Sequence, residues 1–569
     1  MIKKFSMLAL AGLIALPGVA AASAGKTPSD LNQRIDELSR QLDELKAQLA
    51  KQNEDIADMG SSVEDMDEKF EEKSSAWDLA ARFQLYGDYR GRLDYMTSST
   101  APQYTVNQIT QGFSMALAAP PAQGGFGFAG PYSIDMIRMA VQGMKMYTPQ
   151  QRAGLFQMMG LTPVQSYDVN SDTLMTNRFR LNMRVKATEN VTFKARLAMY
   201  KTWGMESNPA ATFGSPFTLD SFMMDGNSTR QPVDNVVRVD RAFFNWAGIG
   251  GMPIWLSIGR RPTTDGPPEQ LRLGTGERMA SPIAFMNYAF DGATLGYAYE
   301  WGSDQLGVGR VRFCYGRGFE DGINSNALND MDFAGFNWDV LTSGNRLLNV
   351  QMFEAFNIVN APDGVEFPNP LELSGLVPYQ NGILDKQNLG NIYHTTLVYM
   401  DKVGDLNWFV AGGWSRTDPS GYDELGNSLL GSWWEPLEDK DGYTVYAGVR
   451  YDIDDLRLKL GLEYNWGSEN WIAMTPAHDD MFNSKLAVRG QVFEAYMIYD
   501  LPTGEAISKF AKTFMRLGYQ YYKYDYSGSG SWLGAPADVD DLSSDPLLAQ
   551  FYPALDDMSQ VYLTFDIFF

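Results

Sequence analysis

Arginine and lysine side chains recur at every second position in several segments of this chain. Residues two apart share one face of a β-strand, so these cations would form a continuous basic surface. If that surface bordered a narrow aqueous space, Coulomb attraction would favour anions there. The basic positions predicted to line such a space are Arg178, Arg180, Arg184, Lys186, Lys194, Arg196, Arg310, Arg312, Arg450, Arg457, Lys459 and Arg516.

The basic surface contrasts with the formal net charge of the whole chain, which is −23 at pH 7. Few acids share the same predicted face, chiefly Asp88, Glu463 and Asp566. An alternative stays open, in which the arginines pair with acidic loop residues and only brace a wall. The acidic balance also suits an exported protein that binds no nucleic acid.

Residues suited to catalysis or metal binding are sparse. The chain has two histidines, His394 and His478, and one cysteine, Cys314, so we expect no disulfide and no metal cluster. No serine stands in a recognisable nucleophile context. The acidic stretch 538–541 (DVDD) has oxygen ligands for Ca²⁺, but a solvated loop explains it better. We expect no enzyme activity, no catalytic residue, no metal and no cofactor.

The C-terminal segment shows most clearly which element would carry these faces. Val561, Leu563, Phe565, Ile567 and Phe569 alternate with residues of mixed polarity. A strand in a lipid-embedded barrel needs one apolar and one mixed face, although the last strand of a soluble sheet would show the same pattern.

Counting such segments predicts an all-β fold, a transmembrane antiparallel up-and-down β-barrel of about 16 strands within residues 78–569. Short and long connections alternate along the chain, as they do in outer-membrane barrels. No apolar run after residue 24 is long enough for a spanning helix. The predicted strands are 82–95, 176–187, 191–203, 235–247, 253–261, 286–299, 307–317, 332–341, 347–358, 391–400, 406–416, 442–452, 456–466, 485–499, 513–524 and 558–569.

The N-terminal residues 1–24 have the pattern of an export signal. Lys3 and Lys4 precede an apolar stretch, and small residues at 22–24 (ASA) would form the cleavage site. No cysteine follows, so a lipid anchor is not expected. The mature protein is therefore predicted to begin near Gly25.

Residues 25–76 are predicted to form an α-helical coiled coil. Apolar residues recur at alternating steps of four and three, which is the heptad pattern of a helix seam. A single amphipathic helix on its own domain is the alternative, and the choice between dimer and trimer stays open, with trimer preferred. The seam residues are Leu31, Ile35, Leu38, Leu42, Leu45, Leu49 and Ile56.

Together these features resemble a bacterial outer-membrane porin of the sixteen-stranded trimeric type, preceded by a coiled coil. Residues 259–268 (GRRPTTDGPP) are similar to a stretch in an uncharacterised family of such coiled-coil-prefixed barrels. The resemblance covers the chain from about residue 78 and brings no established substrate. It implies that the terminal Phe569 is the signal read by the barrel-assembly machinery.

Two connections are expected to affect the interior. The resemblance implies that the loop after the fifth strand, 262–285, folds inward as a constriction with Arg260, Arg261, Asp265, Glu269 and Arg272. An ordinary surface loop is the alternative. The first long connection, 96–175, has helical spacing at 134–144 and a cap at Thr148-Pro149, which predicts a cap, plug or partner-binding element.

The expected function is passive diffusion of small hydrophilic solutes through a homotrimeric pore that prefers anions. The expected location is the outer membrane of a Gram-negative bacterium, in contact with its lipid, with the coiled coil in the periplasm. The alternative is a structural protein whose coil tethers the membrane to peptidoglycan. A barrel enzyme is the third and weakest hypothesis.

Overall fold

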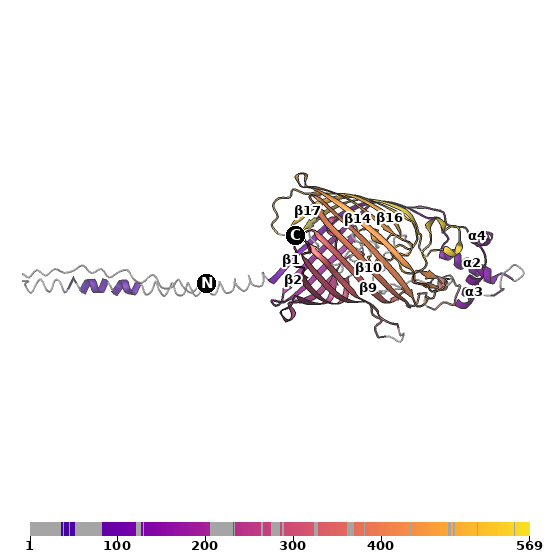
Figure 1. Cartoon of the computed structure of the whole chain (residues 1–569), viewed down its shortest axis with the longest axis horizontal. Coiled ribbons are helices and arrows are strands. Elements are labelled where there is room, and N and C mark those ends of the chain that lie inside the picture. The colour runs from indigo at the N-terminus through magenta and orange to yellow at the C-terminus, as the bar shows by residue number, and fades with distance from the viewer. Residues whose placement is uncertain are drawn as a thin grey trace, which may run out of the picture. The chain divides into compact units, whose positions relative to one another are not determined.

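Sixteen antiparallel strands pair side by side into a closed barrel, in which the first strand pairs with the last (Figure 1). Each strand overlaps one of the predicted segments, so the predicted barrel and its strand number are confirmed. The strands are β1 (Phe83–Thr100), β2 (Asp168–Lys186), β3 (Val191–Thr202), β4 (Asp234–Ala247), β5 (Ile254–Pro262), β6 (Ala289–Glu300), β7 (Val308–Phe319), β8 (Met331–Ser343), β9 (Arg346–Val359), β10 (Asn388–Val403), β11 (Leu406–Pro419), β14 (Asp441–Ile453), β15 (Leu458–Gly467), β16 (Gly490–Asp500), β17 (Lys512–Tyr524) and β18 (Leu555–Phe568). A separate two-stranded sheet joins β12 (Asn427–Ser428) to β13 (Gly431–Ser432).

The computed structural model falls into two units, Met1–Ala81 and Arg82–Phe569. It describes residues 36–37, 39–44, 46–51, 82–120, 127–128, 130–204, 232, 234–262, 266–274, 285–286, 289–323, 328–360, 369–380, 382–432, 435–475, 480–481, 484–508, 510–550 and 552–569.

The described residues of the first unit are helical and exposed. Two predicted seam residues, Leu42 and Leu49, are 55% and 59% exposed, as unpartnered seam positions would be. The other seam residues (Leu31, Ile35, Leu38, Leu45 and Ile56) and the export signal lie outside the described residues. The coiled coil therefore stays a prediction.

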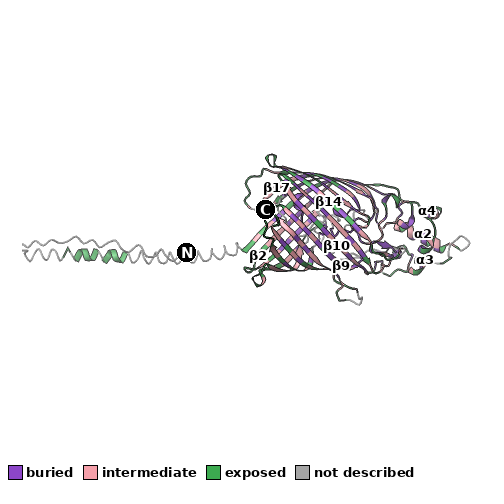
Figure 2. Cartoon of the chain, in the orientation of Figure 1, coloured by how far each residue is buried: buried purple, intermediate pink, exposed green. Residues whose placement is uncertain are grey.

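The two faces of the strands differ as predicted. Along β18, Val561, Phe565 and Ile567 are exposed on the outer face, while Tyr562 and Asp566 are fully buried on the inner one. The same alternation of buried and exposed residues runs around the barrel (Figure 2). The outer surface is thus apolar and the inner surface polar, because the side chains of a strand alternate between its faces.

The first two strands extend further than the sequence predicted. Residues 96–100 and 168–175 are rich in Ser, Thr, Asn and Asp, which are typical of loops. They nevertheless pair with each other, as Ser99 does with Asp168, because each satisfies the other's backbone groups. The strand predicted at 485–499 instead begins at Gly490, and Lys485–Ala487 forms a 3-10 turn.

The chain's last residue closes the ladder against β1. Backbone hydrogen bonds join Gly87 and Phe569 in both directions, at 2.9 and 3.0 Å. A side chain at position 87 would clash, because a Cβ there would lie 2.4 Å from the carbonyl oxygen of Arg180 and 2.8 Å from the ring of Phe569. The role of Phe569 as an assembly signal stays a prediction.

Helices gather at the end of the barrel away from the C-terminus, which we call the loop end (Figure 1). The helices predicted after 132 and after Thr148 are present, and each begins at a hydroxyl cap, Ser133 or Thr148. No helix in the described part of the chain is long and apolar enough to cross a membrane. The helices are α2 (Val106–Ala118), α3 (Ile134–Met144), α4 (Pro149–Met158) and α5 (Pro370–Leu373), with 3-10 turns at Ile249–Gly251, Glu269–Leu271, Asp454–Leu456, Lys485–Ala487, Val539–Asp541 and Pro546–Leu548.

These helices form a packed cap with its own apolar core. Phe113 and Leu117 of α2 and Ile137 and Val141 of α3 pack with Leu547 from the β17–β18 connection. The long first connection is therefore a folded element, and residues of other loops pack against it.

A charge on the apolar outer face should weaken the barrel in a bilayer. Leu462, on β15, is 60% exposed on that face. We expect Leu462→Arg to destabilise the protein by about 2–4 kcal/mol, measured by urea unfolding from lipid vesicles, because the guanidinium must enter hydrocarbon. Leu437→Arg, in an exposed loop, is the control and should change the unfolding free energy by less than about 0.5 kcal/mol. Equal effects would show that Leu462 does not face lipid.

Candidate functional site

The interior wall carries far more acid than the sequence analysis expected. Beside Asp88, Glu463 and Asp566, six further carboxylates have side chains on the inner face. They are Asp94, Asp240, Asp339, Asp452, Glu494 and Asp500. The expectation of three main acids was therefore wrong, because the two-residue alternation brings acids from strands all around the ring to the inner face.

Half of the twelve predicted basic residues are paired with these wall acids. Arg180 and Arg178 both contact Asp88, at 2.8 and 3.4 Å. Arg196 pairs with Asp240. The acidic partners of these arginines lie on wall strands and not in loops. The alternative, in which the arginines brace the wall, therefore applies, but with partners other than the predicted loop acids.

The same pairing continues around the barrel. The four pairs are Arg312–Asp339 at 2.6 Å, Arg450–Asp452 at 2.7 Å, Lys459–Asp500, and Arg90–Asp566 at 2.6 Å. Removing a charge from water is expensive, and a nearby opposite charge offsets much of that cost. Pairing is therefore what permits so many charges on one wall.

For four predicted residues on the wall, the side chain forms neither an ion pair nor a hydrogen bond with another described residue. These are Arg184, Lys186, Lys194 and Arg310, which lie on β2, β3 and β7. Lys194 sits 5.9 Å from the ring centre of Phe243, a cation–π distance. We call the interior face of β2–β7 the basic arc, because these four cations lie on it.

Arg457 does not lie on the wall. It occupies the turn before β15, is exposed, and has a positive φ of 54°. The sequence prediction began that strand two residues too early, because Leu456 fits the alternation but belongs to the turn.

The loop after β5 enters the barrel and reaches its far wall. In the ring of strands, β15 and β16 lie opposite β5 and β6. The carbonyl oxygens of Leu271 and Arg272 accept hydrogen bonds from Arg450 and Arg516, each at 2.8 Å, and that of Gly274 accepts from Lys512. Three cations of the opposite wall thus hold the backbone of residues 271–274.

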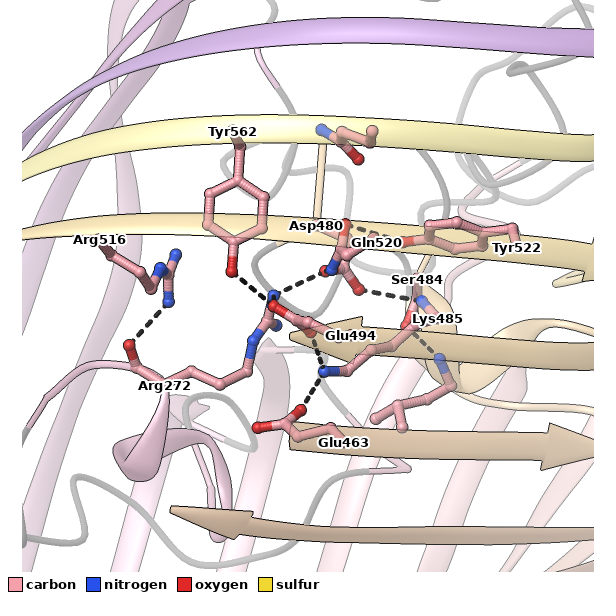
Figure 3. Close-up of polar contacts among 12 residues, drawn as sticks. Arg272, Glu463, Asp480, Ser484, Lys485, Glu494, Arg516, Gln520, Tyr522 and Tyr562 are labelled. Atoms are coloured by element: carbon pink, nitrogen blue, oxygen red, sulfur yellow. Dashed lines mark hydrogen bonds and ion pairs between the residues drawn. The ribbon is translucent and has the colours of Figure 1, made fainter. Parts of the chain in front are cut away.

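The Arg272 side chain anchors this loop through a buried charge network (Figure 3). Its guanidinium lies 3.0 Å from Asp480 and 3.1 Å from Glu494. Lys485 joins Glu494, at 2.5 Å, to Glu463. Two cations and three carboxylates meet here, and none of the five side chains is more than 5% exposed.

Neutral donors complete the network. The Tyr562 hydroxyl donates to Glu494 at 2.5 Å, and the Gln520 amide donates to Asp480 at 2.7 Å. Burial alone would lower the pKa of Arg272, but the Glu494 and Asp480 carboxylates raise it well above its ordinary value. Arg272 is therefore a permanent cation that ties two loops to the wall.

The connection between β15 and β16 also folds into the interior. Trp471 packs edge-on against Phe285 of the first inward loop, with ring centres 5.5 Å apart. His394 of β10 stacks between Phe353 and Trp471 at 4.9 and 5.2 Å, and its Nε2 lies 3.1 Å from the carbonyl oxygen of Ile472. The two loops fill the interior beside β8–β16 with packed side chains.

The other predicted constriction residues do not share one location on the barrel. Glu269 is buried with the loop. Arg261 points inward and donates from Nε to Ser257 at 3.1 Å. Arg260 lies on the opposite face of β5, 3.4 Å from the exposed Asp291. Asp265, like His478, lies outside the described residues.

The sequence analysis missed Asp480, Lys485 and Glu494 as members of the site. Lys485 and Glu494 fell inside the strand predicted at 485–499, and Asp480 fell in the connection before it. A signal was present, since Lys485 and Arg489 flank three apolar residues, an unusual setting for two cations on a surface loop.

Loss of the anchoring cation should destabilise the interior. We expect Arg272→Gln to lower the unfolding free energy by about 3–5 kcal/mol, measured by denaturant titration in detergent, because it leaves buried carboxylates short of a partner. The double variant Arg272→Gln/Asp480→Asn should recover part of the loss. Arg138→Gln, on the exposed side of α3, is the control; an equal effect there would contradict the network's role.

Several solved structures have a similar architecture at low sequence identity. OmpT of Vibrio cholerae, an outer-membrane protein in its trimer form, is 9% identical with a TM-score of 0.35, covering 86% of this chain and 99% of that one. OmpF of Salmonella typhi, in complex with daunomycin, is 11% identical with a TM-score of 0.35, covering 85% and 97%. OprB of Pseudomonas putida, at high pH, is 9% identical with a TM-score of 0.39, covering 87% and 96%.

No curated protein sequence matches the chain. A family model does match, over residues 168–569, which include fifteen of the sixteen barrel strands. The chain thus belongs to the family described as "Protein of unknown function (DUF3373)".

Proposed function

We propose that this protein is an outer-membrane channel through which small hydrophilic solutes diffuse. One observation carries the proposal: a closed barrel of sixteen strands has an apolar outer face and a charged inner wall. A barrel of this size is wider than wall side chains can fill, so its interior holds either a channel or inserted chain. Here the described loops pack mainly against β8–β17, although Met481 also contacts Tyr200 of β3.

The solute path follows the basic arc in this proposal. The inward loops pack mainly against β8–β17, and Arg184, Lys186, Lys194 and Arg310, which have no ion-pair partner among the described residues, lie on β2, β3 and β7. Water and solutes would then meet Arg184, Lys194 and Arg310 in turn. This arrangement supports the predicted anion preference, but fewer residues contribute to it than the sequence suggested. Arg450 and Lys459 are paired with wall acids, and Arg516 donates to the backbone of the inward loop.

The inward loop would narrow the path. Residues 266–274 reach across the interior, with Arg272 as their anchor and Arg261 at their base. The proposed constriction therefore keeps Arg261, Glu269 and Arg272 and leaves out Arg260.

The remaining parts of the proposal concern assembly. The predicted export signal supports secretion across the inner membrane, and the terminal Phe569 supports handling by the barrel-assembly machinery. The heptad of residues 25–76 supports a homotrimer with its coil in the periplasm, on the side where the short turns lie.

Single-channel recording in planar bilayers tests the channel and its selectivity separately. We expect open events, with a reversal potential under a KCl gradient that indicates anion preference. The triple variant Arg184→Gln/Lys194→Gln/Arg310→Gln should lower the anion-to-cation permeability ratio about two- to fivefold, because it removes local positive potential from the path.

Arg138→Gln, outside the barrel wall, is the matched control and should leave the ratio unchanged. A barrel that is correctly folded yet electrically silent would contradict the channel. A conducting barrel that prefers cations would contradict only the role of the basic arc.

A further inference from the structure

A cavity of about 850 Å³ lies at the loop end of the barrel. Its walls come from α2, from the β9–β10 and β11–β14 connections, and from the two stretches 527–537 and 547–554 of the β17–β18 connection. Volumes of this order are typical of sites for small organic molecules. The site is separate from the charge network around Arg272.

The polar face of α2 points into this cavity. Asn107, Thr110, Gln111 and Ser114, spaced as one helical face, line it, while Phe113 packs into the apolar core of the cap. A surface helix ordinarily turns such a face toward bulk water. Asn107, Gln111 and Ser114 are exposed and Thr110 is buried, so this face supplies hydroxyl and amide groups to a cavity that is open to solvent along the helix.

The cavity also holds a buried cation. Arg489 is 1% exposed, and its guanidinium donates to the carbonyl oxygens of Trp471, Ser527 and Ser531 at 3.1, 3.0 and 2.5 Å. No carboxylate among the described residues lies within ion-pair distance of it. Three neutral acceptors fix its position, and Glu469 acts on the charge only from beyond ion-pair distance, so no counter-charge contacts it.

The other charged and polar groups of the wall do not supply that missing counter-charge. Glu435 contacts Lys440, at 3.3 Å, so its charge is already balanced. The first turn of α2 lines the cavity with Thr105, Val106 and Asn107, which adds the positive end of a helix dipole. Ser432 is buried and its hydroxyl has no hydrogen-bond partner among the described residues.

We propose that this cavity binds a small organic anion, a carboxylate carried on an apolar body. Arg489 and the first turn of α2 supply the positive potential, and the Ser432 hydroxyl and the polar face of α2 supply hydrogen bonds. The apolar body would lie against Leu533, Pro536, Leu547 and Leu548, which complete the wall.

Burial supports the electrostatic part of the argument. It lowers the pKa of Arg489 to about 9, and the Glu469 carboxylate, which is not in contact with the cation, only partly offsets that effect. The group stays charged at neutral pH, so a bound carboxylate would relieve the cost of burying it. The proposal goes beyond channel function, since binding at the loop end requires no open path through the barrel.

Calorimetric titration of the full-length protein in detergent tests the charge requirement. The probes are benzoate, neutral benzamide and cationic benzylamine, which share one ring and differ in charge. We expect benzoate to bind and benzamide to bind about tenfold more weakly or less, because a charge-assisted contact is lost. Equal affinity for benzoate and benzamide, or no benzoate binding at about 10 mM, would overturn the proposal.

Two variants and one control locate the site. Arg489→Gln should weaken benzoate binding about tenfold or more, and Gln111→Glu, which adds a negative charge to the cavity wall, about three- to tenfold. Gln157→Glu makes the same change on the exposed surface of α4 and should have no effect.

If Arg489→Gln fails to form a heat-modifiable barrel, Gln111→Glu alone decides, because Gln111 is exposed and its change leaves the fold intact. Benzoate affinity that is unchanged by Gln111→Glu would overturn the assigned site. Conductance recorded on the same preparations separates this result from the proposed function, since binding and conduction can fail independently.

Discussion

Closure of the β-ladder is the constraint on which the rest of the structure depends. β1 pairs with β18 along nearly its whole length, so every strand has two neighbours and the sheet has no free edge. In hydrocarbon no water can satisfy a backbone group, which makes closure a requirement. Once the ladder closes, the two-residue period of each strand decides which side chains face inward, and the buried ion pairs of the wall lie on that side.

A wall with so many inward charges creates a second constraint, which pairing meets. Arg90 and Asp566 come from neighbouring strands that are 476 residues apart in the sequence. Arg272 and Glu494 are 222 residues apart and come from an inserted loop and the wall opposite its origin. The side chains of both pairs are almost fully buried, so each charge depends on its partner to offset the cost of burial. The loop is therefore held in place by the opposite wall.

The sequence predicted the strands and their faces, because alternation is a local property read within ten residues. The strand bounds were wrong where strand pairing overrides local composition, as at the polar ends of β1 and β2. They were also wrong at Arg457, where a turn interrupts an apolar–polar alternation. The sequence could not predict the partners of Arg272. Asp480, Lys485 and Glu494 look ordinary in their own segments, and only the closed ring brings β15 and β16 opposite β5 and β6.

Basic side chains have two roles on this wall: some hold the inward loop and others face the proposed solute path. The presence or absence of an acceptor from the loop distinguishes the two roles. Arg450, Arg516 and Lys512 donate to the backbone of residues 271–274, so the loop is drawn toward the strands that carry them. Arg184, Lys194 and Arg310 face the other side, where the described loops offer no such acceptor. On that side Arg178, Arg180, Arg196 and Arg312 pair with wall acids instead, and Arg184, Lys194 and Arg310 have no ion-pair partner among the described residues. The asymmetry of the interior is thus a consequence of where the loop lands, and the anion preference that we propose depends on it.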